Sequence, residues 1–421
     1  MTAIPVSVVV VSRGRPALLT RTLMGLSQVQ YAAFEIIVVA DREGIAAVEA
    51  LPFADALKRV PFDDANISAA RNVGISHAAG DVVAFIDDDA VPEPQWLHFL
   101  IAPFARAEVA AAGGFVRGRN GISFQWQARG LDHFGATTPL EVDPEQATVL
   151  TPPKGRAIKT EGTNMAVRRA VLRELGGFDA AFHYYLDETD LNLRLAQSGG
   201  LTAIVPLAEV HHGFAANPVR RADRVPQDLY EIGASWAVFQ RKHVPEAERA
   251  RHWQALRAHE RRRLVGHMVG GGVEPRDVRR ILRRLDAGYA EGQGRSLTRA
   301  QLPAHPAEAL KPFPSKPRRS VVISTRPWRF AKDMARAAEK VKNGEIVTVL
   351  SFSLTSIYHQ CRFDPCGAWV QRGGLFGRSV RFEPLFRLTT RARRTEKESN
   401  RVAKQRGLTP MSAMKQPHSA A

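Results

Sequence analysis

Three continuous apolar runs in the first half of the chain predict strands that are buried on both faces. The runs are Ile4–Val11, Glu35–Ala40 and Asp81–Ile86, and each is rich in valine and isoleucine. Segments with helical spacing lie between the runs, at Pro16–Leu26 and Asn66–Ala79. Strands that alternate with helices are typical of an α/β domain with a mostly parallel sheet, which we therefore expect here.

Polar residues follow each of the three predicted strands. Ser12 ends the first strand, Asp41 follows the second, and the triplet Asp87-Asp88-Asp89 follows the third. In parallel α/β sheets, ligands bind beyond the carboxyl ends of the strands. The shared position of these residues predicts a ligand site at that edge of the sheet.

The chain divides into five regions by composition. The α/β domain covers residues 1–240, and residues 241–299 have a mainly helical pattern. Five prolines in residues 300–319 indicate a linker. A strand–helix–strand pattern predicts a small basic α/β module over residues 320–390. Residues 391–421 are polar and charged with almost no large apolar residues, so we expect them to be disordered.

The net charge changes sign along the chain. Residues 1–240 carry 21 Lys and Arg against 27 Asp and Glu, whereas residues 241–421 carry 38 against 15. The second half, with a net charge of +23, could bind nucleic acid, an anionic membrane surface or an acidic glycan. A solvated, arginine-rich helical face would give the same composition, and no nucleic-acid module is recognisable.

Cysteine content and hydropathy exclude several classes of protein. Two cysteines, Cys361 and Cys366, cannot form a disulfide framework and argue against a zinc site. No run approaches the length of a membrane span, and the first residues lack the basic region of a signal peptide. We therefore expect a cytoplasmic protein, with peripheral contact at the inner face of the membrane as an open alternative.

The triplet at residues 87–89 is the strongest chemical signal. Adjacent carboxylates repel one another unless cations neutralise them, and oxygen ligands of this kind suit Mg²⁺ or Mn²⁺. A metal ion there could stabilise the negative charge of a departing diphosphate. The alternative is an acidic turn that only closes a strand.

Seven segments in this order resemble the family-2 inverting glycosyltransferases of the GT-A fold. The resemblance covers residues 1–240 and implies a GT-A-like, Rossmann-type domain that binds a nucleotide-sugar donor. The segments are residues 4–15, the strand ending at Asp41, and residues 66–74, 85–92, 161–169, 175–179 and 185–195.

The resemblance also implies roles on the donor side. It places Ser12 against the nucleotide, Asp41 against the base, and Asp89 on a Mn²⁺ or Mg²⁺ ion. Arg71 would meet phosphate or base, since a guanidinium binds such groups bidentately. Asp87 or Asp88 would lie on the ribose side. The base itself stays open, because only one of the family's usual two acidic or amide residues is present at Asp41.

The acceptor side is implied in the same way. The family places its catalytic base in an acidic pair, which is inverted here, so that Glu188 occupies the base position and Asp187 is the alternative. Acidic residues in a first helical turn also simply favour the helix dipole. Glu161, Asn164 and Asp190 would line the acceptor or sugar side.

A third metal ligand is expected from the pair His211-His212, because neutral imidazole binds such metals and the family often has a histidine near this point. Either histidine could be the ligand, and a purely structural pair is the alternative.

We therefore expect a metal-dependent transfer, with inversion, from a nucleotide-sugar to a hydroxyl of a glycan or lipid-linked acceptor, in bacterial polysaccharide assembly. A sugar-1-phosphate nucleotidyltransferase would normally carry a glycine-rich loop after the first strand, where only Gly14 is present. A binding protein for nucleic acid or another anionic polymer is the second alternative, and its binding would depend steeply on salt.

Overall fold

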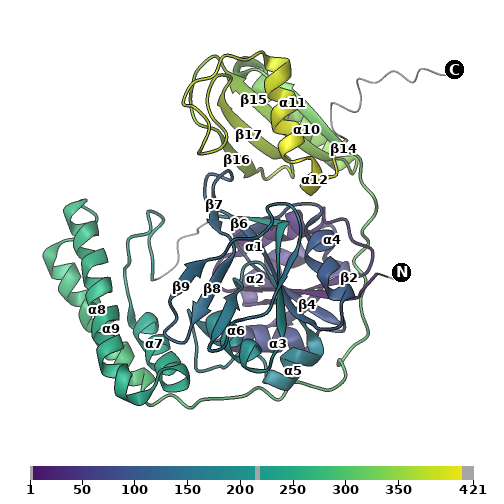
Figure 1. The fold of residues 1–421 in the computed structure, drawn as a ribbon. Helices are drawn as coiled ribbons and strands as arrows, with labels where there is room; N and C mark the ends of the chain where they lie inside the picture. Colours follow the sequence, from purple (N-terminus) through teal and green to yellow (C-terminus); the bar gives the residue numbers. More distant parts are fainter. Residues whose placement is uncertain (1–2, 214–218, 410–421) are drawn as a thin grey trace.

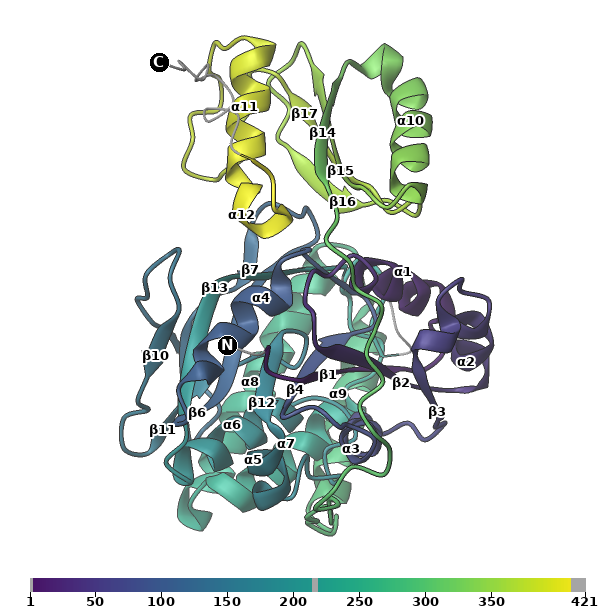
Figure 2. The same cartoon turned by 90° about the vertical axis from the view of Figure 1, so that its right-hand side faces the viewer.

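A computed structural model describes residues 3–213 and 219–409 of the chain. Figure 1 shows a larger body built on a central sheet, with a pair of long helices at one side, and a smaller module above it. The extended segment after the long helices runs along the larger body and leads into the module (Figures 1 and 2). No helix among the described residues is long and apolar enough to cross a membrane.

A ten-stranded mixed sheet forms the centre of the larger body. Its strands are β1 (Val6–Ser12), β2 (Phe34–Ala40), β3 (Lys58–Pro61), β4 (Val82–Asp87), β5 (Ala90–Pro92), β6 (Val109–Arg117), β7 (Phe124–Trp126), β10 (Thr148–Leu150), β12 (Met165–Arg168) and β13 (Leu201–His212). The order is β10-β13-β6-β12-β4-β1-β2-β3, with β5 on β13 and β7 on β6. Strands β1 to β4 pair in parallel, and the antiparallel β12 joins them to β6.

Helices cover both faces of this sheet because alternate residues of each strand point to opposite sides. The helices are α1 (Pro16–Leu26), α2 (Arg42–Glu49), α3 (Ile67–Ser76), α4 (Trp96–Ile101), α5 (Arg169–Leu175) and α6 (Asp187–Gln197). Val8 and Val10 pack in one core with α1, α2 and α4, whereas Val9 packs in a second core with α3, α5 and α6. The predicted α/β fold with a parallel sheet at its centre is confirmed.

The register of the parallel strands brings their polar ends together. Ser12 lies opposite Ala40, and Val11 lies opposite Asp87. The carboxyl ends of β1, β2 and β4 therefore meet at one edge of the sheet, where the sequence predicted a ligand site.

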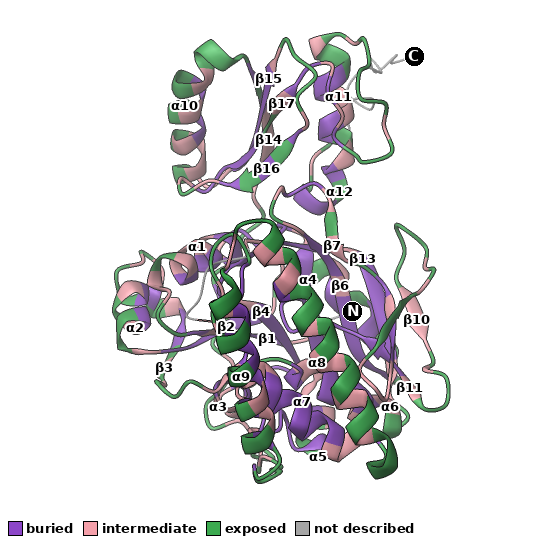
Figure 3. Cartoon of the chain, turned by 90° about the vertical axis from the view of Figure 1, so that its left-hand side faces the viewer, coloured by how far each residue is buried: buried purple, intermediate pink, exposed green. Residues whose placement is uncertain are grey.

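A second, smaller sheet and three helices stand beside this edge. The sheet has the order β11-β8-β9, with bounds Arg156–Lys159 (β11), Arg129–Asp132 (β8) and Thr137–Pro139 (β9). The helices are α7 (Tyr230–His243), α8 (Glu246–Val269) and α9 (Pro275–Gly292). Gly288 of α9 allows a close approach to α7, since an added Cβ would lie 1.9 Å from the Tyr230 carbonyl oxygen. Much of α8 remains exposed (Figure 3).

The predicted linker is fastened to the larger body. Residues 300–319 form neither helix nor strand, but Phe313 is buried against Phe34, with 5.5 Å between ring centroids. The Lys311 amide also donates to the carboxylate of Glu35 at 2.9 Å. The segment therefore follows a defined path across the domain surface.

The module consists of a four-stranded sheet between helices (Figure 2). Its elements are β14 (Ser320–Thr325), α10 (Phe330–Lys342), β15 (Ile346–Ser353), β16 (Gln360–Phe363), β17 (Trp369–Gly374), α11 (Arg391–Arg401) and α12 (Ala403–Arg406). The sheet order is β14-β15-β17-β16. The expectation of disorder from residue 391 onward is wrong for residues 391–409, because α11 packs on β15 of the module and α12 contacts β13 of the larger body. Residues 410–421 lie outside the part that the structure describes.

Candidate active site

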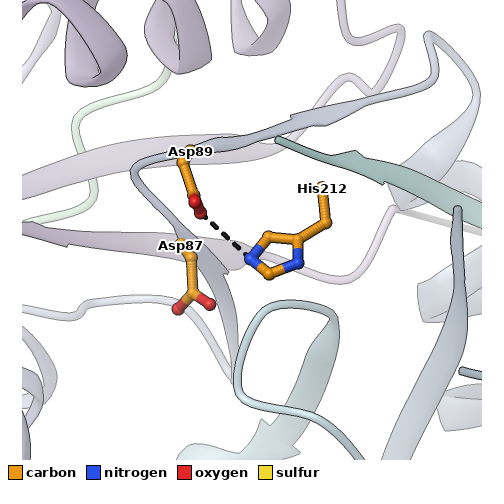
Figure 4. Close-up of side chains that lie close together, drawn as sticks. All are labelled: Asp87, Asp89 and His212. Atoms are coloured by element: carbon orange, nitrogen blue, oxygen red, sulfur yellow. Dashed lines mark ion pairs between the residues drawn. The ribbon is translucent and has the colours of Figure 1, made fainter. Parts of the chain in front are cut away.

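Asp87, Asp89 and His212 form a compact group at the carboxyl edge of the sheet (Figure 4). Their ligand atoms all lie within 4.8 Å of one another. His212 ends β13, which pairs antiparallel with β5, and its Nε2 lies 3.1 Å from Asp89 Oδ1. Burial lowers the pKa of His212, but the hydrogen bond with Asp89 and the negative charges of Asp89 and Asp87 together outweigh it and raise that pKa above its usual value. We call these three residues the carboxylate–histidine group.

Asp88, the middle residue of the triplet, is fully buried. Ser12 Oγ donates to its Oδ2 at 2.6 Å, and Arg15 Nη2 lies 2.7 Å from its Oδ1. Burial raises the pKa of Asp88 to about 7, although Arg15 and Ser12 act in the opposite direction. The expected contact of Asp88 with the nucleotide is therefore wrong, and the Ser12 hydroxyl holds this carboxylate.

His211 lies on the other face of β13, because successive residues of a strand point to opposite sides. Its Nε2 is 2.8 Å from Glu93 Oε1, and both residues are buried. Glu93, Glu209 and His211 are close enough to hold an ion, but the guanidinium groups of Arg406 and Arg117 neutralise the two carboxylates. The expected role of His211 as a ligand beside Asp89 is wrong.

Arg71 connects the carboxylate–histidine group to the start of α6. Its Nη2 lies 3.2 Å from Asp87 Oδ1, and its Nη1 forms an ion pair with Asp187. The guanidinium is buried, and a Cβ on Gly162 would lie 2.4 Å from Nη2. The Arg71 side chain therefore lies between two carboxylates, and its expected contact with phosphate or base stays a prediction.

The two candidate bases at the start of α6 have different surroundings. Asp187 is 2% exposed and paired with Arg71, whereas the Glu188 side chain is 19% exposed. Burial raises the pKa of Asp187 to about 7 against the effect of Arg71. Burial acts the same way on Glu188, but Lys159, with Nζ 2.6 Å from Glu188 Oε1, lowers that pKa to about 2. Glu188 is thus the more accessible and more acidic of the pair.

The chain enters α6 through a strained turn. Tyr185 and Leu186 have φ values of 76° and 66°, in the left-handed region that non-glycine residues rarely adopt. Such conformations cost roughly 1–3 kcal/mol each and persist only where the surroundings impose them. Leu186 is buried, which holds the turn and fixes the direction in which the acidic pair points.

Asp41 acts as a cap at the end of β2. Its Oδ1 accepts from the Gly44 amide at 2.9 Å, and its Oδ2 accepts from the Gly14 amide at 2.6 Å. The carboxylate therefore starts α2 and fixes the loop after β1. It lies at the predicted edge of the sheet.

The three residues expected on the acceptor side separate in the structure. Asn164 is fully buried, and its amide oxygen accepts from Trp96 Nε1 at 2.8 Å. Asp190 is also fully buried, in ion pairs that join α6 to α7. The expectation that these two line the acceptor is wrong, because neither reaches the surface. Glu161 pairs with Arg129 and keeps 11% of its side chain exposed.

The comparison with known families identifies the chain. A family model described as "Glycosyltransferase like family 2" matches residues 4–225, which is more than half of the sequence. The chain belongs to the family-2 glycosyltransferases. The match contains the central sheet, the carboxylate–histidine group and the acidic pair of α6.

Curated relatives of this glycosyltransferase share limited identity with it. The O-antigen biosynthesis protein RfbC of Myxococcus xanthus is 29% identical over 249 residues, which are 56% of this chain and 19% of RfbC. The succinoglycan biosynthesis protein ExoM of Rhizobium meliloti is 28% identical over 192 residues, covering 43% of this chain and 57% of ExoM. The chain thus matches less than two thirds of the length of each relative.

Solved structures similar to the glycosyltransferase include S. aureus TarS, with a TM-score of 0.41 at 16% identity over 69% of this chain and 54% of that chain. The mannosyltransferase PcManGT of Pyrobaculum calidifontis, in complex with GDP-Man and Mn²⁺, has a TM-score of 0.40 at 16% identity. The match covers 70% of this chain and 88% of that chain. The family assignment rests on the match over residues 4–225.

Sequence reasoning about this glycosyltransferase missed the basic residues that hold its carboxylates. Lys159 contacts Glu188, and Arg15 contacts Asp88. Arg21 is half-buried near Asp89, and its partial burial lowers its pKa. Each is a single basic residue without a motif around it. Only Lys159 has a position that could have indicated a role at the site, because it lies just before the segment at residues 161–164 that resembles the family.

Proposed function

We propose that this glycosyltransferase moves a sugar from a nucleotide-sugar donor to an acceptor hydroxyl with inversion and with Mn²⁺ or Mg²⁺. The observation that carries the proposal is the carboxylate–histidine group at the carboxyl edge of the sheet. Arg71 links this group to the acidic pair of α6 through its ion pairs with Asp87 and Asp187. Family membership supports a transferase over the alternatives of a polymer-binding protein and a nucleotidyltransferase.

The donor set of the carboxylate–histidine group fits a small divalent cation. Two carboxylates and one imidazole converge within 4.8 Å, and oxygen and imidazole ligands suit Mn²⁺. Asp87, Asp89 and His212 would hold the ion. When bound, such an ion neutralises charge that develops on a leaving diphosphate.

The remaining chemistry falls to residues of the chain. Glu188 accepts the proton of the acceptor hydroxyl. At the same time the hydroxyl oxygen forms a bond to the anomeric carbon of the donor sugar, and the bond between that carbon and the diphosphate oxygen breaks. Attack from the face opposite the leaving group inverts the configuration. Arg71 keeps Asp187 and Asp87 in place, so that the base and the ion ligands hold a fixed relation. Asp41 and the loop at Gly14 lie where the nucleotide would bind.

Bacterial polysaccharide or glycan assembly is the setting that we propose, supported by the names of RfbC and ExoM. A glycan or lipid-linked acceptor fits that setting. Peripheral contact with an anionic membrane is part of the proposal, because residues 241–421 carry a net charge of +23.

Adjacent histidines provide the test of the ion site. Binding of UDP, GDP and dTDP is measured by calorimetry with Mn²⁺ and with EDTA, in the native chain and in His212→Ala, His211→Ala and Asp89→Ala. We expect nucleotide binding that depends on Mn²⁺, weakens at least tenfold in His212→Ala and Asp89→Ala, and persists in His211→Ala. The reason is that even mutation of a residue that only supports a metal ligand lowers metal affinity by roughly 10–100-fold. Melting temperatures check that each variant is folded.

Equal affinity with Mn²⁺ and with EDTA would show that the ion plays no part. A loss in His211→Ala but not in His212→Ala would move the site to the other face of β13. Consumption of the matching nucleotide-sugar, followed by release of the nucleoside diphosphate, then tests turnover itself.

A further inference from the structure

The open edge of β14 forms a groove in the module, away from the candidate active site. β14 is a terminal strand of its sheet and pairs only with β15 among the described strands. Residues 321–325 of β14 form its floor, and residues of α10 and the first residue of α11 form its walls. Its volume is about 690 Å³. Figure 2 shows β14 facing the viewer between α10 and α11. We call this feature the edge groove.

The edge groove is strongly basic. The basic residues of the lining are Arg326, Arg329, Arg336, Lys340 and Arg391. Lys340 Nζ pairs with Glu345 Oε2 at 2.9 Å, and Arg391 Nη1 donates to the Thr325 carbonyl oxygen at 2.7 Å. Arg326, Arg329 and Arg336 are exposed. The single acidic residue of the lining, Asp333, is buried and accepts from Thr325 Oγ1 at 2.5 Å. The walls therefore present positive charge to whatever enters.

The floor of the groove is suited to an extended chain. The outer edge of a terminal strand presents backbone N–H and C=O groups that a further strand can pair with. The six residues of β14 extend over roughly 20 Å at about 3.3 Å per residue, which matches a peptide of similar length. Side chains of an added strand would point alternately toward α10 and toward α11.

We propose that the edge groove binds an extended acidic peptide segment of a partner protein, which adds to β14 as a fifth strand. Charge complementarity selects this occupant. Residues 410–421 of the chain itself contain no Asp or Glu, so they do not match the basic walls. A second copy paired through its own β14 would bring two basic grooves together, which like-charge repulsion opposes.

Strand addition distinguishes this binding from general attraction to polyanions. A nucleic acid or a sulfated glycan would use the arginines and the lysine but could not pair with the backbone of β14. A probe that keeps its charge and loses its backbone donors therefore separates the two modes.

The test uses the full chain and a fluorescein-labelled hexapeptide of alternating Val and Glu, with affinity measured by fluorescence anisotropy. The first control is the same peptide N-methylated at every backbone nitrogen. The second is the protein variant Arg336→Glu with Lys340→Glu. Its matched control is Lys342→Glu, which lies on α10 about 200° around the helix from Lys340 and outside the groove lining.

We expect the peptide to bind the native chain and Lys342→Glu within twofold of each other. The double variant and the N-methylated peptide should each weaken binding about tenfold, from lost charge and lost backbone pairing respectively. Equal binding of the N-methylated and the unmodified peptide, or no binding at millimolar peptide, would each overturn the proposal.

Discussion

Lys159 sets the proton affinity of the base that we propose. Burial alone would raise the pKa of Glu188, but the ammonium group 2.6 Å away lowers it to about 2. Glu188 is therefore ionised at every physiological pH and ready to accept a proton. The same ion pair makes Glu188 a weaker base. If an acceptor hydroxyl displaced Lys159 from Glu188, the carboxylate would become a stronger base.

At the residue scale, Glu188→Gln should lower turnover by roughly 10²–10⁴-fold, the usual contribution of general-base catalysis. Nucleotide affinity should hardly change, because the base meets the acceptor and not the diphosphate. The measurement is steady-state turnover beside calorimetry of the nucleoside diphosphate. Asp187→Asn is the control, since its partner Arg71 also holds Asp87. We expect that variant to lose nucleotide affinity together with turnover.

A pH profile sharpens the same assignment. A carboxylate base works only when deprotonated, so activity falls as the pH drops through its pKa. Lys159→Gln removes the charge that lowers the pKa of Glu188, which should shift the acid limb of kcat/KM to higher pH. An acid limb that stays in place in Lys159→Gln, or full turnover in Glu188→Gln, would assign the base elsewhere.

Strand geometry explains which residue roles could be predicted from sequence. The apolar runs predicted that Ser12, Asp41 and the triplet would share one edge, and they do. The turn between β4 and β5 separates the Asp88 side chain from those of Asp87 and Asp89. The period of two along β13 separates His211 from His212. The partners on each side, such as Glu93 for His211, come from distant segments and leave no local pattern.

At the element scale, helix α11 is held by polar contacts and not by apolar packing, and the sequence therefore predicted disorder there. The buried face of α11 consists of Arg394, Thr395, Glu398 and Ser399. Glu398 accepts from Ser379 Oγ at 2.6 Å and from Gln371 Nε2 at 2.8 Å. A helix held in this way has the composition of a disordered segment, so hydropathy could not reveal it.

The joint between α6 and α7 depends on one buried carboxylate. Asp190 lies 2.8 Å from both Lys242 Nζ and His243 Nε2 and is fully buried. Asp190→Ala should lower the free energy of unfolding by about 3 kcal/mol, because breaking a buried pair leaves charge uncompensated. Urea unfolding followed by tryptophan fluorescence measures it. The control is Asp286→Ala, whose partner Arg257 is 42% exposed.

Asp286→Ala should lower the free energy of unfolding by less than about 1 kcal/mol, because exposed ion pairs contribute little to stability. Equal costs in the two variants would mean that Asp190 contributes no more than a surface pair, and that apolar packing alone holds α7 on α6.

At the scale of the whole molecule, one arginine near the end of the described chain joins the module to the larger body. Arg406 of α12 contacts both oxygens of Glu93 at 2.9 Å, across 313 residues of sequence. Both side chains are 1% exposed. The guanidinium also lies 4.5 Å from the centroid of the Trp369 ring. Partners so distant in sequence could not be predicted from local patterns.

Acid should loosen this joint. Burial raises the pKa of Glu93, but Arg406 and His211 outweigh it and hold that pKa well below the usual range of a glutamate. A carboxylate whose pKa is lower in the folded chain stabilises the fold above its unfolded pKa, and this contribution is lost as the pH falls through the folded value. The docked module is therefore most secure at neutral pH.

Arg406→Ala should release the module, because it leaves Glu93 buried with His211 as its remaining partner. We expect a loss of about 3–5 kcal/mol, the usual cost of breaking a buried pair. Proteolysis within residues 300–319 should accelerate, since this segment leads into the module, and cleavage rates measure it. Replacing both residues, as Glu93→Met with Arg406→Met, should restore most of the resistance, because apolar side chains of similar volume need no partner. If Arg406→Ala is cleaved no faster than the native chain, the module is held by its other contacts and the ion pair only orders α12.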